Sequence, residues 1–359
     1  MDVRVGYTSY LVALVAEAST AAGRLVDVDP QRRAEMALQS RLTAAKLSAR
    51  LDGSPLEDAT AAAVDDGTWN PPAGIVSVDP AGGWAGALRL DGMATAEVAA
   101  VEYANLVRAS AEEPRLALEF FDRPLAVLAE LHGLISAGLV DPSVIGRSRA
   151  TAQAIHDGAQ GRVVFNTPEP DALPGLLGDL EAWLRGDGQE GSAAFPAPVV
   201  AAVVHELLLQ WQPYEAANGR LARAAARLVL RARGMDPDGL AVPEKSWALD
   251  PGGYYNEVAA TIRRRGDMGP WVERHTEALV TAFAEAARAA HPTAPPMEPS
   301  SRARSAVQAM TPGEVVTVAE YAQRHSVSRE TAWRDLRSLA VAEAVLTEPR
   351  SLGRRFRKP

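Results

Sequence analysis

Ala- and Leu-rich stretches whose apolar residues recur with helical spacing constrain this chain more than any other feature. Apolar residues three and four positions apart predict amphipathic α-helices. We therefore predict a mainly α-helical fold, with little strand outside short hairpins. The predicted helices cover residues 31–51, 95–110, 116–139, 170–186, 197–211 and 218–234, and at least two more lie within 253–290.

The composition excludes several classes of site. The chain has no cysteine, so disulfides, thiolate metal sites and cysteine nucleophiles are ruled out. No uninterrupted apolar stretch reaches the roughly 18 residues that a membrane span needs. The apolar run near the N-terminus lacks a basic leader and a clear cleavage site. We therefore expect a cytoplasmic protein without a membrane partner.

Charge is distributed unevenly along the chain. Residues 301–359 hold 11 Arg and Lys against 6 Asp and Glu, whereas residues 1–300 hold 26 against 39. A basic end on an acidic body indicates a separate module with an anionic partner, although a solvated basic tail has the same composition. The proline-dense segment 291–301 is predicted to be the linker to this module.

The C-terminal segment 302–359 resembles a winged helix-turn-helix of bacterial regulators, a small α+β domain. We expect a helix at 318–325, a turn at 326–328, a second helix at 328–339 capped by Ser328, and a basic two-stranded wing. Such a second helix fits the major groove of DNA, and wing arginines neutralise phosphates. The alternative is a winged helix used only for protein contact or dimerisation. The candidate DNA-binding residues are Arg329, Thr331, Arg334, Arg337, Arg354, Arg355 and Arg357.

A second basic cluster opens the predicted helix 218–234. Asn218 and Gly219 begin this helix, and Arg220 and Arg223 lie on one face of its first turn. Backbone N–H groups at a helix N-terminus bind anions, and two arginines three residues apart can reach the same phosphate chain. By itself the pattern also fits a plain capped helix with solvent-exposed arginines.

The surrounding residues resemble the motif of the Fic/Fido family, His-Pro-Phe-x-(Asp/Glu)-Gly-Asn-(Gly/Lys)-Arg-x-x-Arg. This chain reads Gln-Pro-Tyr-Glu-Ala-Ala-Asn-Gly-Arg-Leu-Ala-Arg over residues 212–223. The resemblance implies a Fic/Fido helical bundle over residues 96–290, preceded by an N-terminal helical region at 1–95. It also implies that His205 is a packing residue. The short β-hairpin flap, which docks a protein target, falls on Val163, Val164 and Phe165.

A further resemblance lies upstream, within residues 31–53. Some Fic proteins carry an inhibitory helix with the pattern (Ser/Thr)-x-x-x-Glu-(Gly/Asn), whose glutamate pairs with the last motif arginine. Here Ser48, Asp52 and Gly53 keep this pattern with Asp in place of Glu. The resemblance implies that Asp52 faces Arg223. The alternative is an ordinary helix that ends in Asp-Gly.

The departures from the motif affect the chemistry of the family, which is AMP transfer from ATP to a protein hydroxyl. Gln212 stands where the family has its catalytic histidine, and an amide cannot take a proton near neutral pH. Ala216 replaces the carboxylate that holds Mg²⁺, so we expect no Mg²⁺ to be held by the motif. Ala217 replaces a glycine at a position where positive φ strains any other residue. Glu215 is adjacent but is expected to point elsewhere.

These residues leave alternative functions. In the favoured hypothesis, a degenerate Fic domain binds ATP, another nucleotide or a phosphorylated ligand, and the winged helix binds DNA. In the second, the domain is an active protein adenylyltransferase autoinhibited by the 48–53 helix. The third is a toxin-like protein restrained by that same helix. A homodimer is expected in each case, because Fic domains and winged helices often self-associate.

Overall fold

The computed structural model places the site within a helical body to which the C-terminal segment is attached. Residues 292–298 of the predicted linker and the candidate DNA-binding residue Arg354 lie outside the described residues. The structure describes residues 5–70, 77–78, 88–89, 95–156, 162–187, 191–264, 266–291, 299–348 and 355–359.

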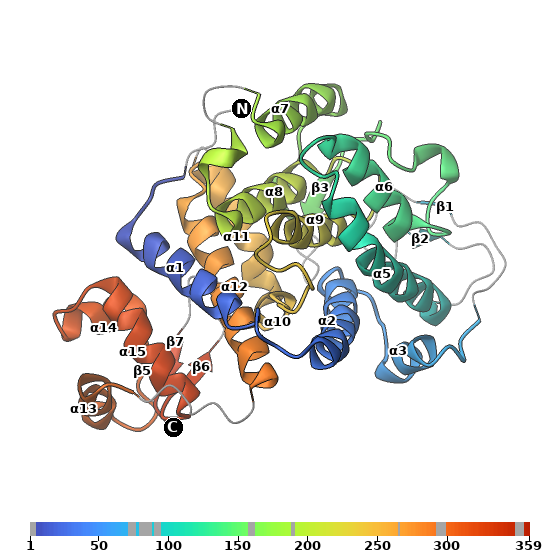
Figure 1. The fold of residues 1–359 in the computed structure, drawn as a ribbon. Coiled ribbons are helices and arrows are strands. Elements are labelled where there is room, and N and C mark those ends of the chain that lie inside the picture. Colours follow the sequence, from blue (N-terminus) through green and yellow to red (C-terminus); the bar gives the residue numbers. More distant parts are fainter. Residues whose placement is uncertain are drawn as a thin grey trace.

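Two central helices form the middle of the body. Every residue of α8 (Ala197–Trp211) from Pro198 to Leu209 is buried, and so is every residue of α9 (Asn218–Ala232) from Asn218 to Leu230. Their sequences match the predicted helices closely, because Pro at the start of α8 and Asn at the start of α9 are clear helix signals. The two helices pack against each other, and the other helices of the body surround them (Figure 1).

The surrounding helices cover this pair from several sides. Helices α2, α5 and α6 pack on α9, whereas α11 and α12 pack on α8, and α1 lies along α12 (Figure 1). Their bounds are α1 Ser9–Gly23, α2 Pro30–Leu51, α3 Asp58–Asp65, α5 Thr95–Ala117, α6 Pro124–Ser136, α7 Leu173–Arg185, α10 Glu244–Ala248, α11 Pro251–Arg263 and α12 Gly269–Ala290.

Three features of the body differ from the sequence prediction. The helix predicted at 116–139 is replaced by a turn and the shorter α6, which begins at Pro124 because proline is favoured in the first turn of a helix. Helix α5 does not end at residue 110 but continues through Pro114 to Ala117. Pro114 is exposed, so water can reach the carbonyl that the missing proline N–H leaves free. Helix α1 was not predicted. It begins after Thr8, whose side chain accepts a hydrogen bond from the Leu11 N–H at 3.0 Å.

The strands are short and form small antiparallel sheets. The predicted flap residues Val163, Val164 and Phe165 lie on β4 (Val163–Asn166), which pairs with β3 (Ala154–His156) so that Ile155 lies opposite Phe165. A second hairpin joins β1 (Ser77–Val78) to β2 (Leu88–Arg89). In the C-terminal segment β7 (Arg355–Arg357) lies between β5 (Val315–Thr317) and β6 (Leu346–Glu348).

The segment 301–359, which we call the C-terminal unit, has the elements expected of a winged helix-turn-helix. Its helices are α13 (Ser301–Ala309), α14 (Val318–Arg324) and α15 (Arg329–Val341). Ser328 caps α15 as predicted, because its side chain accepts a hydrogen bond from the Thr331 N–H at 3.1 Å. The mainly α-helical fold class is therefore confirmed.

The C-terminal unit is continuous with the body. Its buried residues Trp333, Leu336 and Phe356 belong to the same apolar cluster as Leu11 and Leu14 of α1. Figure 1 shows the unit at one end of the molecule, beside α1 and α12. None of the helices in the described part of the chain combines the length and apolarity that crossing a membrane requires.

Candidate functional site

The loop between α8 and α9 contains two residues with left-handed backbone. Gln212 has a φ of 45° and Ala217 a φ of 62°. Left-handed backbone costs a non-glycine residue roughly 1–2 kcal/mol, so other contacts must hold the loop. The Asn218 side chain accepts from the N–H of Tyr214 at 2.9 Å and donates to its carbonyl at 2.7 Å. The Gln212 amide donates to the Leu209 carbonyl at 2.7 Å.

Arg149 fixes this loop from outside the motif. Its side chain is buried and donates from Nε to the Gln212 carbonyl at 2.7 Å and from Nη2 to the Trp211 carbonyl at 3.3 Å. Nη2 also donates to Thr167 Oγ1 at 2.8 Å and to the Pro168 carbonyl at 2.5 Å. One guanidinium therefore ties the C-terminal end of α8 to the segment after β4. Arg149 was not predicted as a site residue, because nothing in the sequence around it indicates such distant partners.

Glu215 is fully engaged in the structure. One carboxylate oxygen accepts from the Ala150 N–H at 2.8 Å, and the other accepts from Thr151 Oγ1 at 2.6 Å. With Ala216 beside it, the motif loop presents no free carboxylate oxygen to a cation. The residues present therefore do not fit the Mg²⁺ that the family chemistry uses. The expectation that Glu215 points away from the anion site matches its position.

His132 supports the loop from α6. Its Nδ1 accepts from the Gly146 N–H at 3.0 Å, which leaves Nε2 as the donor toward the Ala216 carbonyl at 3.3 Å. Its ring stacks on Tyr214 with the ring centroids 4.1 Å apart. Burial lowers the pKa of His132 to about 4. The imidazole is therefore neutral at physiological pH and acts as a fixed hydrogen-bonding support.

The Asp52 carboxylate lies at the N-terminus of α9. A Cβ on Gly219 would fall 2.5 Å from Asp52 Oδ1, so only glycine allows this approach. Asp52 Oδ1 also accepts from Arg223 Nη2 at 2.7 Å and from the Tyr255 hydroxyl at 2.8 Å. Arg220 Nε is 3.5 Å from Asp52 Oδ2. The structure thus brings Asp52 to Arg223, and an internal carboxylate occupies the predicted anion position.

Arg223 is completely buried beneath the end of α2. It donates to the Ser48 hydroxyl at 2.8 Å and to the Ser48 carbonyl at 2.7 Å, and its Nη1 lies 3.5 Å from the Tyr254 hydroxyl. Burial alone lowers the pKa of Arg223, but Asp52 opposes this and raises the pKa well above its ordinary value. Gly53, with a φ of 87°, turns the chain away directly after Asp52.

Arg220 has a carboxylate partner that the sequence analysis did not predict. Its Nη1 forms an ion pair with Glu102 of α5, which is completely buried. Arg220 itself is only 4% exposed. Each of the two motif arginines is therefore already paired with a carboxylate of the same chain. Any external anion must compete with Asp52 and Glu102.

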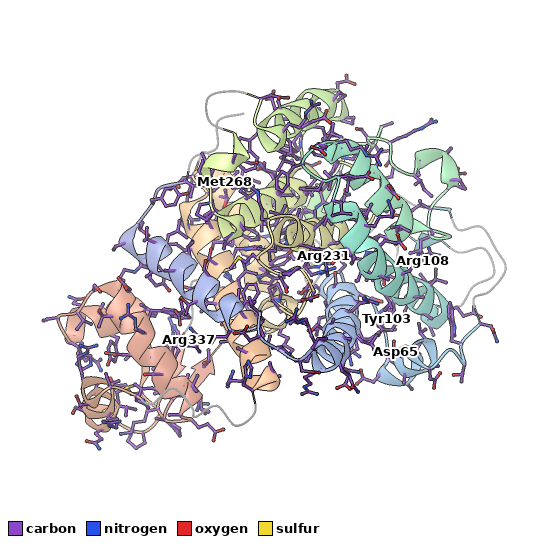
Figure 2. All side chains as sticks on the ribbon, viewed as in Figure 1. Asp65, Tyr103, Arg108, Arg231, Met268 and Arg337 are labelled. Atoms are coloured by element: carbon purple, nitrogen blue, oxygen red, sulfur yellow. The ribbon has the colours of Figure 1, made fainter. Side chains whose placement is uncertain are left out.

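The pairing continues along the buried face of α9. Arg227 Nη2 is 3.0 Å from Glu113 Oε1, and Arg227 Nη1 pairs with Glu244. Arg231 Nη2 is 3.8 Å from Glu113 Oε2 (Arg231 is labelled in Figure 2). Glu113 follows Glu102 by about three helical turns, the same spacing that separates Arg231 from Arg220. This matched spacing is the sequence signal that could have paired α5 with α9.

His205 lies in an aromatic cluster behind the site. Its Nε2 is 2.6 Å from the Tyr254 hydroxyl, and its ring packs edge-on against Trp247 and Trp271. Burial lowers the pKa of His205 well below its ordinary value. A neutral, fully buried imidazole has no access to a substrate, in keeping with a packing role.

The predicted flap lies beside the motif loop. Gln153, just before β3, donates from Nε2 to the Glu215 carbonyl at 3.0 Å. On β4, Phe165 is buried, Val164 is half-buried and Val163 is 52% exposed. The β3–β4 hairpin is thus hydrogen-bonded to the motif loop, and part of its surface faces solvent.

The residues predicted to contact DNA are divided between two environments. Arg334 is exposed and paired with Glu330 of the same helix, whereas Arg337 is covered by α1 and α12. Arg329 contacts Glu273 of α12 at 3.9 Å but remains 53% exposed. Thr331 Oγ1 is 2.9 Å from the capping Ser328 Oγ. On the wing, Arg355 is half-buried and Arg357 is exposed.

Comparison with known proteins agrees with this architecture. Residues 122–230, which include the 212–223 motif, match the Fic/DOC family. Asp52 and Glu102 lie outside the matched range. No curated protein matches the chain.

Several solved structures share the fold. A Fic family protein from Desulfovibrio desulfuricans is 22% identical with a TM-score of 0.61, and the match covers 100% of this chain and 98% of that one. A Fic domain containing signaling protein from Bacteroides thetaiotaomicron is 15% identical with a TM-score of 0.55, covering 79% of this chain and 99% of that one. Fic-1 from C. elegans is 16% identical with a TM-score of 0.50, covering 78% and 71%.

Proposed function

We propose that this chain is a cytoplasmic regulator in which a degenerate Fic domain binds a phosphate-bearing ligand without transferring AMP. The ligand, ATP or another nucleotide, binds at Asn218, Gly219, Arg220 and Arg223 after Asp52 has moved away. The C-terminal unit binds DNA as a winged helix, and the flap is the contact for a protein partner. The protein acts as a homodimer.

The position of the Asp52 carboxylate is the observation that carries this proposal. It accepts from Arg223 and lies against Gly219 at the N-terminus of α9, where backbone N–H groups and the helix dipole favour an anion. A site that holds one carboxylate in this way suits one phosphate group equally well. Ser48 and Gly53 are proposed to have an inhibitory role, because they position the end of α2 over this site.

AMP transfer is the less favoured alternative, because no suitable base is available in the loop. The Gln212 amide cannot accept a proton near neutral pH, and both Glu215 oxygens already accept hydrogen bonds. Losing general-base help costs roughly two to four orders of magnitude in rate.

Ligand binding tests the first part of the proposal. Titration calorimetry with ATP would compare the wild type with Asp52→Asn, using Asp58→Asn as the matched control because Asp58 is 75% exposed and pairs with Lys46 and Arg50 at the surface. We expect Asp52→Asn to bind ATP at least about tenfold more tightly, which corresponds to about 1.4 kcal/mol. Equal affinities in all three proteins would contradict an anion site closed by Asp52.

Label transfer from α-labelled ATP with Mg²⁺ separates the two functions. The proteins to compare are the wild type, Asp52→Gly, and a restored motif with Gln212→His, Ala216→Asp and Ala217→Gly. We expect label only in the restored protein. Label in the wild type or in Asp52→Gly would establish the adenylyltransferase instead, and growth arrest on expression of Asp52→Gly would support the toxin-like alternative.

A further inference from the structure

Helix α15 is the helix that a winged helix-turn-helix would place in the major groove. Its apolar residues Ala332, Leu336 and Leu339 face the core of the C-terminal unit. The face that should meet DNA is therefore the opposite one. In the structure one flank of that face packs on the body, along α1 and α12 (Figure 1).

Glu17 of α1 makes the central contact with this flank. One of its carboxylate oxygens accepts from Trp333 Nε1 at 3.0 Å, and the other pairs with Arg337. The Arg337 side chain is only 12% exposed, and Figure 2 places it where α15 meets α1. Arg337 also lies 3.5 Å from the Val280 carbonyl of α12. A candidate DNA-binding arginine is thus held by the body of the same chain.

Arg329, at the N-terminal end of α15, also contacts the body, but 53% of its side chain stays exposed. The Arg329 guanidinium lies 4.8 Å from the centre of the Tyr10 ring and 3.9 Å from Glu273 of α12. Glu273 accepts from the Thr8 hydroxyl at 2.6 Å, and Tyr10 donates its hydroxyl to Glu277. The flank of α15 therefore rests on a surface with three carboxylates, those of Glu17, Glu273 and Glu277, which we call the acidic face.

The other flank of α15 is open. Arg334 is 64% exposed and Thr331 is half-buried. A major groove about 12 Å wide surrounds the outward half of a helix, so both flanks must be free when α15 is inserted. Helix α1 covers one of them. DNA and α1 cannot occupy this helix together.

We propose that the basic flank of α15, formed by Arg329, Trp333 and Arg337, is one interaction surface with two mutually exclusive occupants. The first is the acidic face of α1 and α12, and the second is the backbone and groove of duplex DNA. Glu17 takes the place of a DNA phosphate at Arg337. This inference rests on the DNA-binding part of the proposed function.

The test uses the full chain and a labelled pool of random-sequence duplexes of about 30 base pairs, because the operator is unknown and phosphate contacts dominate non-specific binding. Fluorescence anisotropy would compare the wild type, Glu17→Gln and the control Asp27→Asn. Asp27 is exposed and lies beyond the end of α1, so both variants change the net charge equally. We expect Glu17→Gln to bind at least about tenfold more tightly than the other two.

A second variant identifies the residue that is released. Adding Arg337→Gln to Glu17→Gln should remove the gain in affinity, because Arg337 is the group that moves from Glu17 to a phosphate. Deuterium exchange of residues 329–341, measured without DNA, reports independently whether Glu17→Gln has loosened α15 from α1.

The outcomes separate this inference from the functions on which it depends. Equally tight DNA binding by the wild type and Glu17→Gln would overturn the shared surface and leave DNA binding intact. If Glu17→Gln still binds DNA more tightly after Arg337→Gln is added, the gain in affinity comes from the changed net charge, and the shared surface is overturned. Faster exchange in α15 with no DNA binding by any variant would overturn both this inference and the DNA-binding proposal. The ATP titration tests the Fic domain separately.

Discussion

At the scale of single residues, the pairing of Arg220 with Glu102 leads to a stability prediction. Glu102→Gln leaves a buried guanidinium with Asp52 as its remaining carboxylate neighbour, at 3.5 Å. Breaking a buried ion pair from one side costs about 3–5 kcal/mol, and we expect a loss of this size in urea unfolding. Glu112→Gln is the control, because Glu112 pairs with Arg115 in solvent and should cost less than about 1 kcal/mol. Similar losses of unfolding free energy in both variants would contradict a buried ion pair between Arg220 and Glu102.

Gly219 and Asp52 should be energetically coupled. Gly219→Ala places a methyl group 2.5 Å from the present position of Asp52 Oδ1 and must displace the carboxylate from Arg223. In an Asp52→Ala background the new methyl group has no carboxylate beside it, and alanine favours the helix more than glycine does. A double-mutant cycle by urea unfolding should therefore show a coupling of about 0.5–3 kcal/mol. Additive effects would mean that the two residues are not in contact.

Glu206 should make stability depend on pH. It is fully buried on α8, neither carboxylate oxygen has a hydrogen-bond partner among the described residues, and burial raises its pKa to about 8. The pKa of Glu206 in the folded protein lies above its unfolded value of about 4.3, so folding favours the protonated carboxyl. The stability that this protonation contributes is fully present below about pH 4.3. It is then lost as the pH rises to about 8.

Glu206→Gln should therefore flatten the fall in stability between about pH 5 and pH 8, as measured by urea unfolding at several pH values. Glu119→Gln, in the turn that follows α5, is the control, since the Glu119 side chain is 42% exposed. If the free energy of unfolding of the wild type does not change between about pH 5 and pH 8, the ionised Glu206 carboxylate must have a stabilising partner in the folded protein.

At the scale of elements, the motif loop and the β3–β4 hairpin form one unit joined by Arg149. Arg149→Met would leave the carbonyls of Trp211, Gln212 and Pro168 without their donor. We expect faster deuterium exchange in residues 150–153 and 212–217, with little change in α12. Arg147→Met is the matched control, because Arg147 is exposed. Faster exchange confined to the hairpin would show that Arg149 does not support the loop.

The predictability of the elements followed the strength of their local signals. Helices α8 and α9 were predicted nearly to the residue, because proline, asparagine and a long apolar run define their limits. The end of α5 was predicted wrongly because Pro114 breaks most helices, and only its exposure permits it here. The motif placed Arg220 and Arg223 in one site, whereas Glu102 became their neighbour through packing of α5 on α9. The signal for this packing, acidic and basic residues with the same spacing on the two helices, joins segments about 120 positions apart and is not local.

At the scale of the whole molecule, the C-terminal unit looked like an independent module in the sequence, because a proline-dense segment precedes it and its charge is opposite to that of the body. In three dimensions it shares a buried cluster with α1. Opposite charge, which suggested separation along the chain, is also what attracts Arg337 to Glu17 across the interface. Sequence alone could not identify this contact, since it joins residues near the two ends of the chain.

The shared cluster predicts that the body and the C-terminal unit lose structure together. Tyr10 is the residue of α1 to change, because it is buried, packs edge-on against Trp333 and lies outside the core of the C-terminal unit itself. In the wild type, α9 and α15 should lose protection from deuterium exchange at the same urea concentration. In Tyr10→Ala, α15 should lose protection at a lower concentration while α9 is unchanged, since the unit then has only its own small core. Tyr7→Ala is the control, because Tyr7 is half exposed and stacks on Phe195 instead. If α15 and α9 still open together in Tyr10→Ala, the packing of Tyr10 on Trp333 is not what couples the two parts.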